Sequence, residues 1–514
     1  MVEQKIGKQI YLYRAESYWD PEKKQSRQRR VYLGKKDPDT GAVIKPREKP
    51  RPRSSRDFGA LWLLRQIDQQ LGLLALLESV FGAAGRDLFN LALFEVCESR
   101  PAYLYGHWVE TAYLPGVGAT SSPAVSEIAA QVGRNDRGRE AFFEQWARHQ
   151  SACEAVVFDI SSLSSYGELL DLLEWGYNRD HESLPQINFG VVMAQPSGVP
   201  LFYRVYPGSI HDVSTLRNIV HSVTSLGVSS SLLVLDRGFY SQDNLTAMAG
   251  AALRFVIPMP FTTKLSLQVL AAAHKQLSSP LAGFAFRQRT MFHLRRPVTI
   301  NQVACTAHVY LEERRRAAEI EALIQRLQQI ESFIAQGIYY RVRDVAAAIR
   351  GQLRGYEKFY AIQVRDGKAS LSRKAKALSL RINRMGKSII LTNDEALHRD
   401  YVLDIYRRKD KVEKIFDTLK NELDAKRLRG HSREVVEGRL FISFIALILY
   451  SRLLFVLNQS TLKKTYSVPS LLAELKKLRT IEMSNGTVLL TELSKKQRDI
   501  FKAFGFPPPE QPSY

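Results

Sequence analysis

The feature that most constrains the fold is a succession of short apolar segments between residues 155 and 260. Five of them read as β-strands because they are rich in Val, Ile, Leu and Phe: 155–161, 187–194, 201–208, 232–238 and 254–260. Helical patterns separate the third strand from the fourth, starting near Asp212 or Ser214, and the fourth from the fifth. Three consecutive strands followed by helix, strand, helix and strand predict an α/β sheet with an antiparallel edge.

Changes of pattern divide the rest of the chain. Leucines spaced by three and four after Phe58 predict helices. Arg-rich strand-like pieces and a long amphipathic helix then interrupt the alternation of strands and helices. A strand of the earlier type follows at 387–393. The expected regions are a basic N-terminal arm or hairpin with a linker (1–56), a helical DNA-binding domain (57–150), a first part of the α/β core (151–262), an inserted α+β domain (263–384), a second part of the core (385–460) and a C-terminal region (461–514).

The N-terminal arm is strongly basic. Residues 1–56 hold 16 Lys and Arg against 7 Asp and Glu. The segments QIYLYRAESYW and SRQRRVYLG alternate enough to form two strands around the turn DPEKK. A small hairpin and a disordered charged tail both fit this composition.

The whole chain carries 73 Lys and Arg against 52 Asp and Glu, a net charge of +21, which predicts a polyanionic partner and makes nucleic acid the first candidate. A basic protein of the membrane surface is the competing interpretation. The N-terminus lacks the apolar core of a signal peptide, and the most apolar run, 441–457, is too short to span a membrane, so we expect a buried helix there. Three cysteines without paired spacing suggest neither disulfides nor a zinc site, and we expect a cytoplasmic protein.

Three acids stand out as candidate catalytic residues. Asp159 ends the apolar run VVFD and Asp236 ends LLVLD, so a rigid sheet would aim both. Glu413 falls on an amphipathic helical stretch, and at about 100° per residue it shares one face with Tyr406 and Lys420, with Lys409 a turn away. A second stripe beside that face, Ile405, Val412, Phe416, Leu419 and Leu423, would be buried.

Each acid also has a simpler interpretation. An Asp at a strand end often forms a turn or caps a helix, and a charged helix face is often only solvated. Asp212 is a fourth carboxylate, but HDVSTLRNIV reads as a helix start, so capping is the better interpretation there. Three converging carboxylates would repel one another and are most stable around divalent cations. Mg²⁺ or Mn²⁺ suits them, and two ions about 3.5–4 Å apart would promote phosphodiester displacement.

These motifs together resemble the DDE transposases of bacterial insertion sequences, in the group with a Tyr-Arg-Glu-Lys signature and an insertion between the second Asp and the Glu. The signature falls on Tyr406, Lys409, Glu413 and Lys420, with Lys409 where Arg is usual. Lys is a point charge without the bidentate fork of Arg, and Arg407 or Arg408 could compensate. Further stretches that match are GYNRDHESLPQINFGVVM, YPGSIHDVSTL and LDRGFYSQDNL.

The resemblance implies an RNase H-like catalytic core, interrupted by the inserted domain, in which Asp159, Asp236 and Glu413 are catalytic and hold two Mg²⁺ or Mn²⁺ ions. It implies that Arg237, Tyr406, Lys409 and Lys420 contact DNA. The expected activity is cut-and-paste transposition on double-stranded DNA, at the terminal inverted repeats and the target, by a homodimer in a synaptic complex with no membrane partner. The alternatives are a structure-dependent nuclease and a domesticated, non-catalytic DNA-binding protein.

Overall fold

The computed structural model describes most of the chain. The described residues are 1–45, 50–118, 120–150, 153–165, 173–176, 182, 184–210, 212–226, 232–423, 427–428, 430 and 432–511, without the side chains of 212, 410–413 and 427–428. Part of the stretch GYNRDHESLPQINFGVVM, which we matched to the family, lies outside them.

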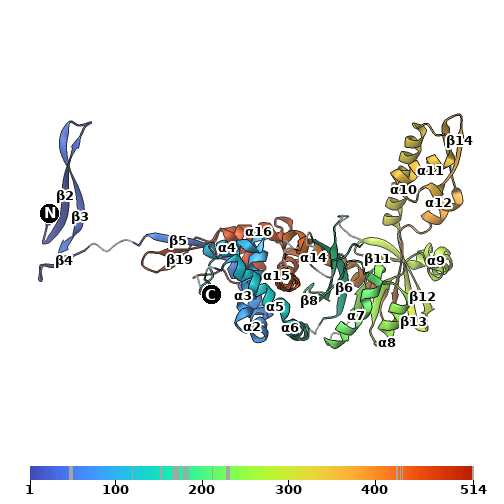
Figure 1. Ribbon diagram of the computed structural model, residues 1–514, viewed down its shortest axis with the longest axis horizontal. Helices are drawn as coiled ribbons and strands as arrows, with labels where there is room; N and C mark the ends of the chain where they lie inside the picture. Colours follow the sequence, from blue (N-terminus) through green and yellow to red (C-terminus); the bar gives the residue numbers. More distant parts are fainter. Residues whose placement is uncertain are drawn as a thin grey trace.

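The N-terminal residues form a long antiparallel ribbon that stands apart from the rest of the molecule (Figure 1). Its strands are β1 (Val2–Ile6), β2 (Gln9–Asp20), β3 (Gln25–Lys36) and β4 (Val43–Ile44), hydrogen-bonded in that order. Of the two interpretations left open for the arm, the structure has the hairpin, formed by β2 and β3. No described residue of the ribbon belongs to the main hydrophobic core, which begins at Phe58.

A helical body follows, and both ends of the chain build it. It comprises α1 (Gly59–Leu71), α2 (Leu73–Phe81), α3 (Ala83–Glu98), α4 (Tyr105–Thr111), α5 (Ser122–Arg134) and α6 (Asp136–His149), with α15 (Arg433–Gln459), α16 (Val468–Lys476) and α17 (Lys495–Ala503). Strand β5 (Pro52–Asp57) pairs with β18 (Arg479–Met483), which pairs with β19 (Val488–Leu490). The predicted helices are thus present, but the residues after 461 share their core: the Trp62 ring lies 4.9 Å from that of Phe501.

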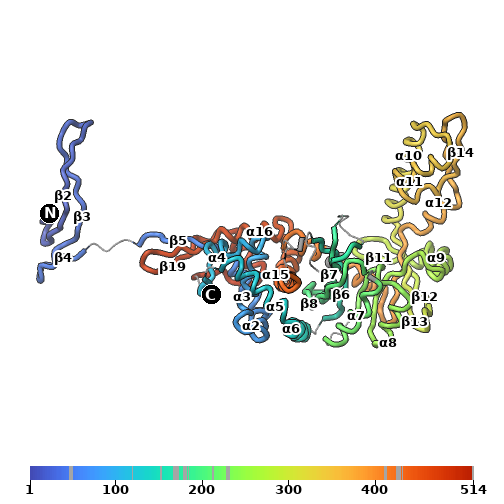
Figure 2. Tube along the Cα trace, viewed as in Figure 1, coloured from blue at the N-terminus to red at the C-terminus, as the bar shows by residue number. Residues whose placement is uncertain are grey.

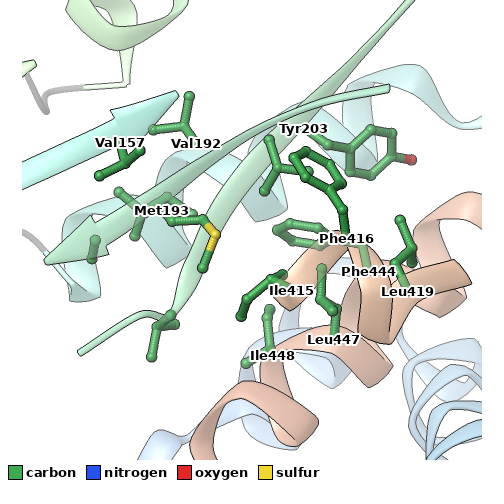
Figure 3. Close-up of a cluster of buried hydrophobic side chains, with 14 of the residues drawn as sticks. Val157, Val192, Met193, Tyr203, Ile415, Phe416, Leu419, Phe444, Leu447 and Ile448 are labelled. Carbon is green, nitrogen blue, oxygen red and sulfur yellow. The ribbon is translucent and has the colours of Figure 1, made fainter. Parts of the chain in front are cut away.

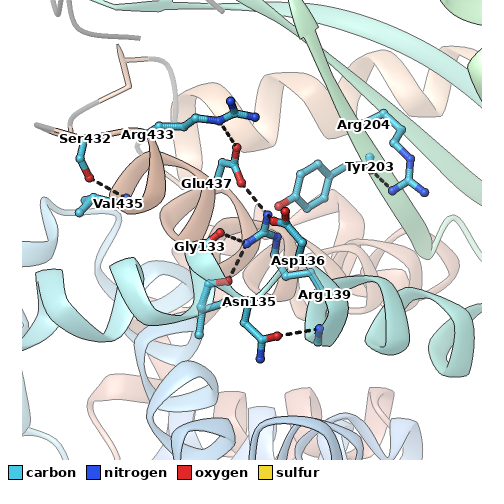
Figure 4. Close-up of polar contacts among 12 residues, drawn as sticks. Gly133, Asn135, Asp136, Arg139, Tyr203, Arg204, Ser432, Arg433, Val435 and Glu437 are labelled. Atoms are coloured by element: carbon cyan, nitrogen blue, oxygen red, sulfur yellow. Dashed lines mark hydrogen bonds and ion pairs between the residues drawn. The ribbon is translucent and has the colours of Figure 1, made fainter. Parts of the chain in front are cut away.

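Helix α15 is held tightly against α5 and α6. A Cβ on Gly438 of α15 would lie only 1.8 Å from the Ala129 carbonyl oxygen, so no larger residue fits this crossing. Arg139 of α6 donates to Glu437 at 2.6 Å (Figure 4). By length and composition α15 could cross a membrane, but 78% of its most apolar window is buried inside the fold, as expected of a core helix.

A large mixed sheet carries the predicted strands. Its order is β11-β12-β13-β16-β10-β9-β6-β7-β8, with β17 beside β6. Neighbours run antiparallel except β10 with β9, β9 with β6 and β6 with β17, which are parallel. The bounds are β6 (Ala155–Ser165), β7 (Gln186–Gln195), β8 (Pro200–Pro207), β9 (Leu232–Leu235), β10 (Phe255–Pro258), β11 (Gly283–Phe286), β12 (Arg289–Ile300), β13 (Val303–Glu312), β16 (Lys387–Thr392) and β17 (Arg427–Leu428).

All six strands predicted between 155 and 260 and at 387–393 are present in this sheet, as are the intervening helices α7 (Asp212–Ser225) and α8 (Gln242–Gly250). The fold is a mixed α/β fold, as predicted. Side chains from both central strands and helices make its core; Figure 3 shows Val157, Val192 and Met193 of the sheet beside Phe416 and Leu447.

The segment 263–384 is less uniform than predicted. Helix α9 (Lys264–Leu277) and strands β11 to β13 belong to the large sheet and its packing, because β13 pairs with β16 from Thr306 to Leu311. A second, separate hydrophobic core begins only after Glu312. It joins α10 (Glu313–Ala335), α11 (Val342–Gln352), β14 (Tyr360–Arg365), β15 (Lys368–Arg373) and α12 (Ala375–Ile382) in an arm that projects from the sheet (Figure 1).

Candidate active site

Asp159 and Asp236 occupy equivalent levels on neighbouring parallel strands. The register of β6 and β9 runs from Ala155 with Leu232 to Phe158 with Leu235, so the two acids are the next residue on each strand. Asp159 is only 6% exposed, whereas the Asp236 side chain is 40% exposed. A buried and a solvent-accessible carboxylate thus stand next to each other where β9 ends, and carboxyl ends of strands are the usual place for ligands in α/β sheets.

One detail differs from our expectation. Asp159 lies in the middle of β6, which continues to Ser165, rather than at its end. The reason is that β7 keeps pairing with β6 beyond β9: Asp159 faces Val191, and the pairs extend to Ser164 with Gln186. Asp236 does follow the last residue of its strand, as predicted.

Asp159 faces the helix that carries Glu413. Side chains alternate between the two faces of a strand, so Val157 and Asp159 share one face and Phe158 the other. Val157 lies in the cluster with Ile415 and Phe416 of α14 (Asp410–Asp417) (Figure 3), while Phe158 contacts Phe239 with ring centroids 5.0 Å apart.

The signature stretch is not the single regular helix that we predicted. It consists of α13 (Arg399–Arg407), a turn at Arg408 and Lys409, then α14, and finally a π-helical segment, η5 (Thr418–Glu422). The Lys409 N–H donates to the Tyr406 carbonyl three residues back at 3.1 Å. The tight turn and the wider π-helical turn each rotate the chain by an angle different from that of a regular α-helix. The assumption of about 100° per residue, from which we placed Tyr406 and Lys420 on one helix face, therefore does not hold.

Lys409 of the signature touches Asp236. Its Nζ lies 3.3 Å from Oδ1 of Asp236, and its side chain is almost completely buried. The two neighbouring arginines point to other partners: Arg407 donates to Glu312 at 2.7 Å and Arg408 to Asp404 at 2.8 Å. Neither therefore takes the place of the usual signature Arg, and the Lys409 ammonium balances the charge of Asp236.

Glu413 is placed only through its backbone. It lies in α14 four residues after Lys409, about one helical turn. Its side chain lies outside the described residues, as do those of Val412 and Asp212, so the predicted convergence of three carboxylates and the predicted capping by Asp212 are not addressed by the structure. The other members of the apolar stripe, Ile405, Phe416, Leu419 and Leu423, are buried as predicted.

The remaining predicted DNA contacts divide into two groups. Arg237 and Tyr406 line a cavity of about 760 Å³ together with Asp236. Lys420 is buried in η5 and is not among the residues that line this cavity. The structure thus brings Asp236, Arg237 and Tyr406 to one cavity, with Lys409 in contact with Asp236, while Lys420 is buried outside the lining of that cavity.

Sequence reasoning missed Glu312, the last residue of β13, which lines the same cavity. It is 6% exposed and accepts from Arg289 and Arg407, each at 2.7 Å. Burial would raise the pKa of this carboxyl, but the hydrogen bond from Arg289 and the charge of Arg407 outweigh it and lower the pKa. The sequence signal that could have identified Glu312 is an acid at the end of an apolar strand, the same signal that identified Asp236.

The side chains present fit a divalent cation in part. Asp159 and Asp236 supply adjacent carboxylate oxygens, the ligands that Mg²⁺ and Mn²⁺ prefer. Within the part of the chain that the structure describes, no group of three or more His, Cys, Asp or Glu side chains could hold a metal ion. A third ligand would have to come from outside that part, where the Glu413 side chain lies.

Comparison with known proteins adds an independent finding. Residues 155–449, more than half of the chain, match the family described as the transposase DDE domain. No curated protein matches the chain. Among solved structures, a piggyBac transposase synaptic complex with hairpin DNA, determined by cryo-EM, is similar at 11% identity and a TM-score of 0.38, over 91% of this chain and 89% of that one.

Proposed function

The chain belongs to the DDE transposase family, and on that premise we propose that it moves an insertion sequence by cutting both ends of the element and joining them to target DNA. The observation that carries this proposal is the placement of Asp159 beside Asp236, with the Glu413 helix packed on the face to which Asp159 points. Asp159, Asp236 and Glu413 are the proposed catalytic residues.

We take the core to be RNase H-like, with the arm from α10 to α12 as the unit inserted between the second Asp and the Glu. The arm has its own hydrophobic core, separate from that of the sheet, which is what an inserted domain requires. The arm leaves the sheet after Glu312, the last residue of β13, and the chain rejoins the sheet at β16. Strands β13 and β16 pair with each other. An insertion at that point leaves the register of the sheet intact.

Asp159, Asp236 and Glu413 would hold two Mg²⁺ or Mn²⁺ ions. When bound, such ions activate the attacking oxygen and neutralise charge on the leaving oxygen. Two ions carry more positive charge than these three carboxylates neutralise, so Lys409 would leave Asp236 and become available to a phosphate oxygen of the DNA.

The proposed reaction is two displacements at phosphorus. Water first attacks the phosphodiester at each element end, so that one P–O bond forms, one breaks, and the departing 3′-oxygen takes a proton. The freed 3′-hydroxyl then attacks a target phosphodiester and loses its proton, and the target's own 3′-oxygen leaves. Arg237, Tyr406, Lys409 and Lys420 would contact the DNA backbone, Tyr406 as a hydrogen-bond donor.

The partners are double-stranded DNA, at terminal inverted repeats and at the target, and a second copy of the chain in a synaptic complex, because an element has two equivalent ends. The N-terminal ribbon is the proposed reader of the repeats. The part of the ribbon between Tyr13 and Tyr32 has only β2 and β3. A two-stranded ribbon fits the major groove, and Arg27, Arg29 and Arg30 lie exposed on this part of β3. We place the protein in the cytoplasm with the chromosome.

The test is a cleavage and joining assay with Mg²⁺ on DNA that carries the element's terminal repeats. Asp236→Asn and Glu413→Gln should lose both steps by more than about a hundredfold. Asp243→Asn is the matched control, because Asp243 is an exposed aspartate in the first turn of α8. Cleavage without joining in the wild type would favour a nuclease, binding without cleavage would favour a DNA-binding protein, and wild-type rates in Glu413→Gln would remove Glu413 from the site.

A further inference from the structure

The cavity beside Asp236 is more basic than the proposed cleavage chemistry requires. Six basic side chains and two acidic ones line its volume of about 760 Å³. Both acids are already neutralised, Asp236 by Lys409 and Glu312 by Arg289 and Arg407. Two more of the lining cations are paired, Arg287 with Asp404 and Arg315 with Glu319. Counting Lys409, seven cations face four acids, so the cavity presents net positive charge to a ligand.

We propose that this cavity is a second phosphate site, which binds a backbone phosphate of the DNA strand next to the bond that is cut at Asp236. The inference deepens the proposed function and rests on it. It assigns a binding role to Arg289 and Arg315, which the sequence did not single out, and to Arg407, which the sequence suggested only as a substitute for the usual signature Arg.

Glu312 anchors two of these arginines. Its two oxygens each accept from a different guanidinium, Oε1 from Arg289 and Oε2 from Arg407, both at 2.7 Å. The carboxylate is buried, whereas the Arg289 side chain is 50% exposed. Each guanidinium has further N–H donors, and a phosphate can accept from two of them at once. One buried acid thus fixes two cations at the cavity wall, and their combined charge exceeds its own.

The ring of Phe286 keeps a third arginine in the same place. The guanidiniums of Arg287 and Arg407 lie 5.4 and 5.2 Å from the centroid of this ring, and Arg287 also pairs with Asp404. Arginines that are held before the ligand arrives lose less conformational entropy when it binds. This arrangement favours an anion site over a set of unrelated surface ion pairs.

Lys387, the first residue of β16, adds a buried charge to the cavity wall. Burial and the charge of Arg316 lower the pKa of this ammonium, which lies 3.1 Å from Nδ1 of His274. A phosphate in the cavity would favour the charged form of Lys387 and so oppose both effects. The cavity thus contains a cation that an anionic ligand would stabilise.

The experiment is titration calorimetry of the full chain with thymidine 3′,5′-bisphosphate, with a chelator present so that no metal ion bridges the phosphates. The bisphosphate should bind, and thymidine should bind at least tenfold more weakly. Arg289→Ala and Arg315→Ala should each weaken bisphosphate binding about tenfold, and Arg289→Lys should restore part of it, because Lys keeps the charge without the fork.

The matched control is Arg343→Ala, since Arg343 is an exposed arginine that pairs with an acid, Asp344, in the separate arm. Equal affinity in Arg289→Ala, Arg315→Ala and Arg343→Ala, or equal affinity for thymidine and its bisphosphate, would overturn the inference. Asp236→Asn separates this inference from the proposed function: bisphosphate binding should persist in that variant while DNA cleavage is lost. If the wild type cleaves DNA but does not bind the bisphosphate, the phosphate site is overturned and the proposed function is not.

Discussion

Two antiparallel strand pairs with the same number of paired residues differ in how much of each is buried. The pair β2 and β3 has ten residues in register, and so has the pair β6 and β7. Every residue of β6 and β7 is buried, while most of β2 and the first eight residues of β3 are exposed or only partly buried. Both pairs are antiparallel ladders, and only β2–β3 has a register shift, between Leu12 and Tyr13. The pairing of the backbone therefore does not by itself explain why one pair is buried and the other exposed.

What distinguishes them is the origin of their stability. Strands β6 and β7 gain stability from apolar burial on both faces. Strands β2 and β3 have only the short β1 and β4 beside them, and over most of their length they form a two-stranded ribbon, which is marginal in water. The ribbon contains basic and aromatic side chains instead, including Arg27, Arg29 and the exposed Trp19. We infer that DNA supplies the missing partner for the ribbon, and that the two pairs differ in function because they differ in burial.

Truncating one aromatic ring in each pair gives the largest contrast. Phe158→Ala should lower the free energy of unfolding by about 3–5 kcal/mol, because it leaves a cavity beside Phe239. Trp19→Ala should change it by less than about 0.5 kcal/mol, since the Trp19 side chain is 65% exposed. Denaturant unfolding of the two variants measures both, and equal losses would mean that the ribbon has a buried core after all.

Removing residues 1–45 tests the ribbon as a whole. The truncated chain should unfold at the same denaturant concentration, because the main core has no described residue before Phe58. Its preference for terminal-repeat DNA over random DNA should fall by about a hundredfold. Competition binding at one fixed salt concentration gives the ratio, and an unchanged preference would assign recognition to the helical body instead.

Low pH should lower the stability of the large sheet and leave that of the N-terminal ribbon unchanged. His293 and His308 lie on β12 and β13, with Nε2 of His293 3.0 Å from Nδ1 of His308, and burial lowers their pKa to about 3 and about 4. Because unfolded histidines bind protons below about pH 6.5 and these do not, stability should fall by up to about 3 kcal/mol, about half from each histidine, as the pH drops from 6.5 to 5.

Residues 1–45 contain no histidine, so the ribbon adds nothing to this pH dependence. The measurement is urea unfolding across that pH interval for the wild type and for His293→Gln with His308→Gln. The double variant should show a flatter profile. A profile as steep as that of the wild type would mean that other groups cause the loss.

The smallest expected change concerns two arginines of the ribbon. Arg27→Ala with Arg29→Ala should reduce the slope of log affinity against log salt by about 2, one for each lost phosphate contact. Stability should remain within about 0.5 kcal/mol of the wild type. Binding isotherms at several salt concentrations test this, and an unaltered slope would show that these arginines do not touch phosphate.

The parts that sequence predicted well are those that depend on local patterns. The runs VVFD and LLVLD predicted strands because they are uninterruptedly apolar, and parallel pairing then placed Asp159 level with Asp236. Alternation around one turn gave the ribbon as one of two interpretations of the N-terminal arm. The family resemblance supplied proposed roles for the acids, which periodicity alone left open and which stay predictions.

The parts that sequence predicted poorly depend on distant contacts. Strands β11 to β13 looked like part of the insertion, because their arginines alternate with apolar residues and their partner β16 comes about 75 residues later. For the same reason Glu312 passed unnoticed, since its arginines come from β12 and α13. The break at Lys409 was also hidden, because the residues around it are good helix formers.

The measurement that tests the account most directly is the location of bound Mn²⁺, by anomalous diffraction, in the full chain bound to terminal-repeat DNA. We predict Mn²⁺ in contact with the carboxylates of Asp159, Asp236 and Glu413, with the Lys409 ammonium displaced from Asp236. Mn²⁺ bound elsewhere, with none touching Asp159 or Asp236, would contradict the proposed catalytic site.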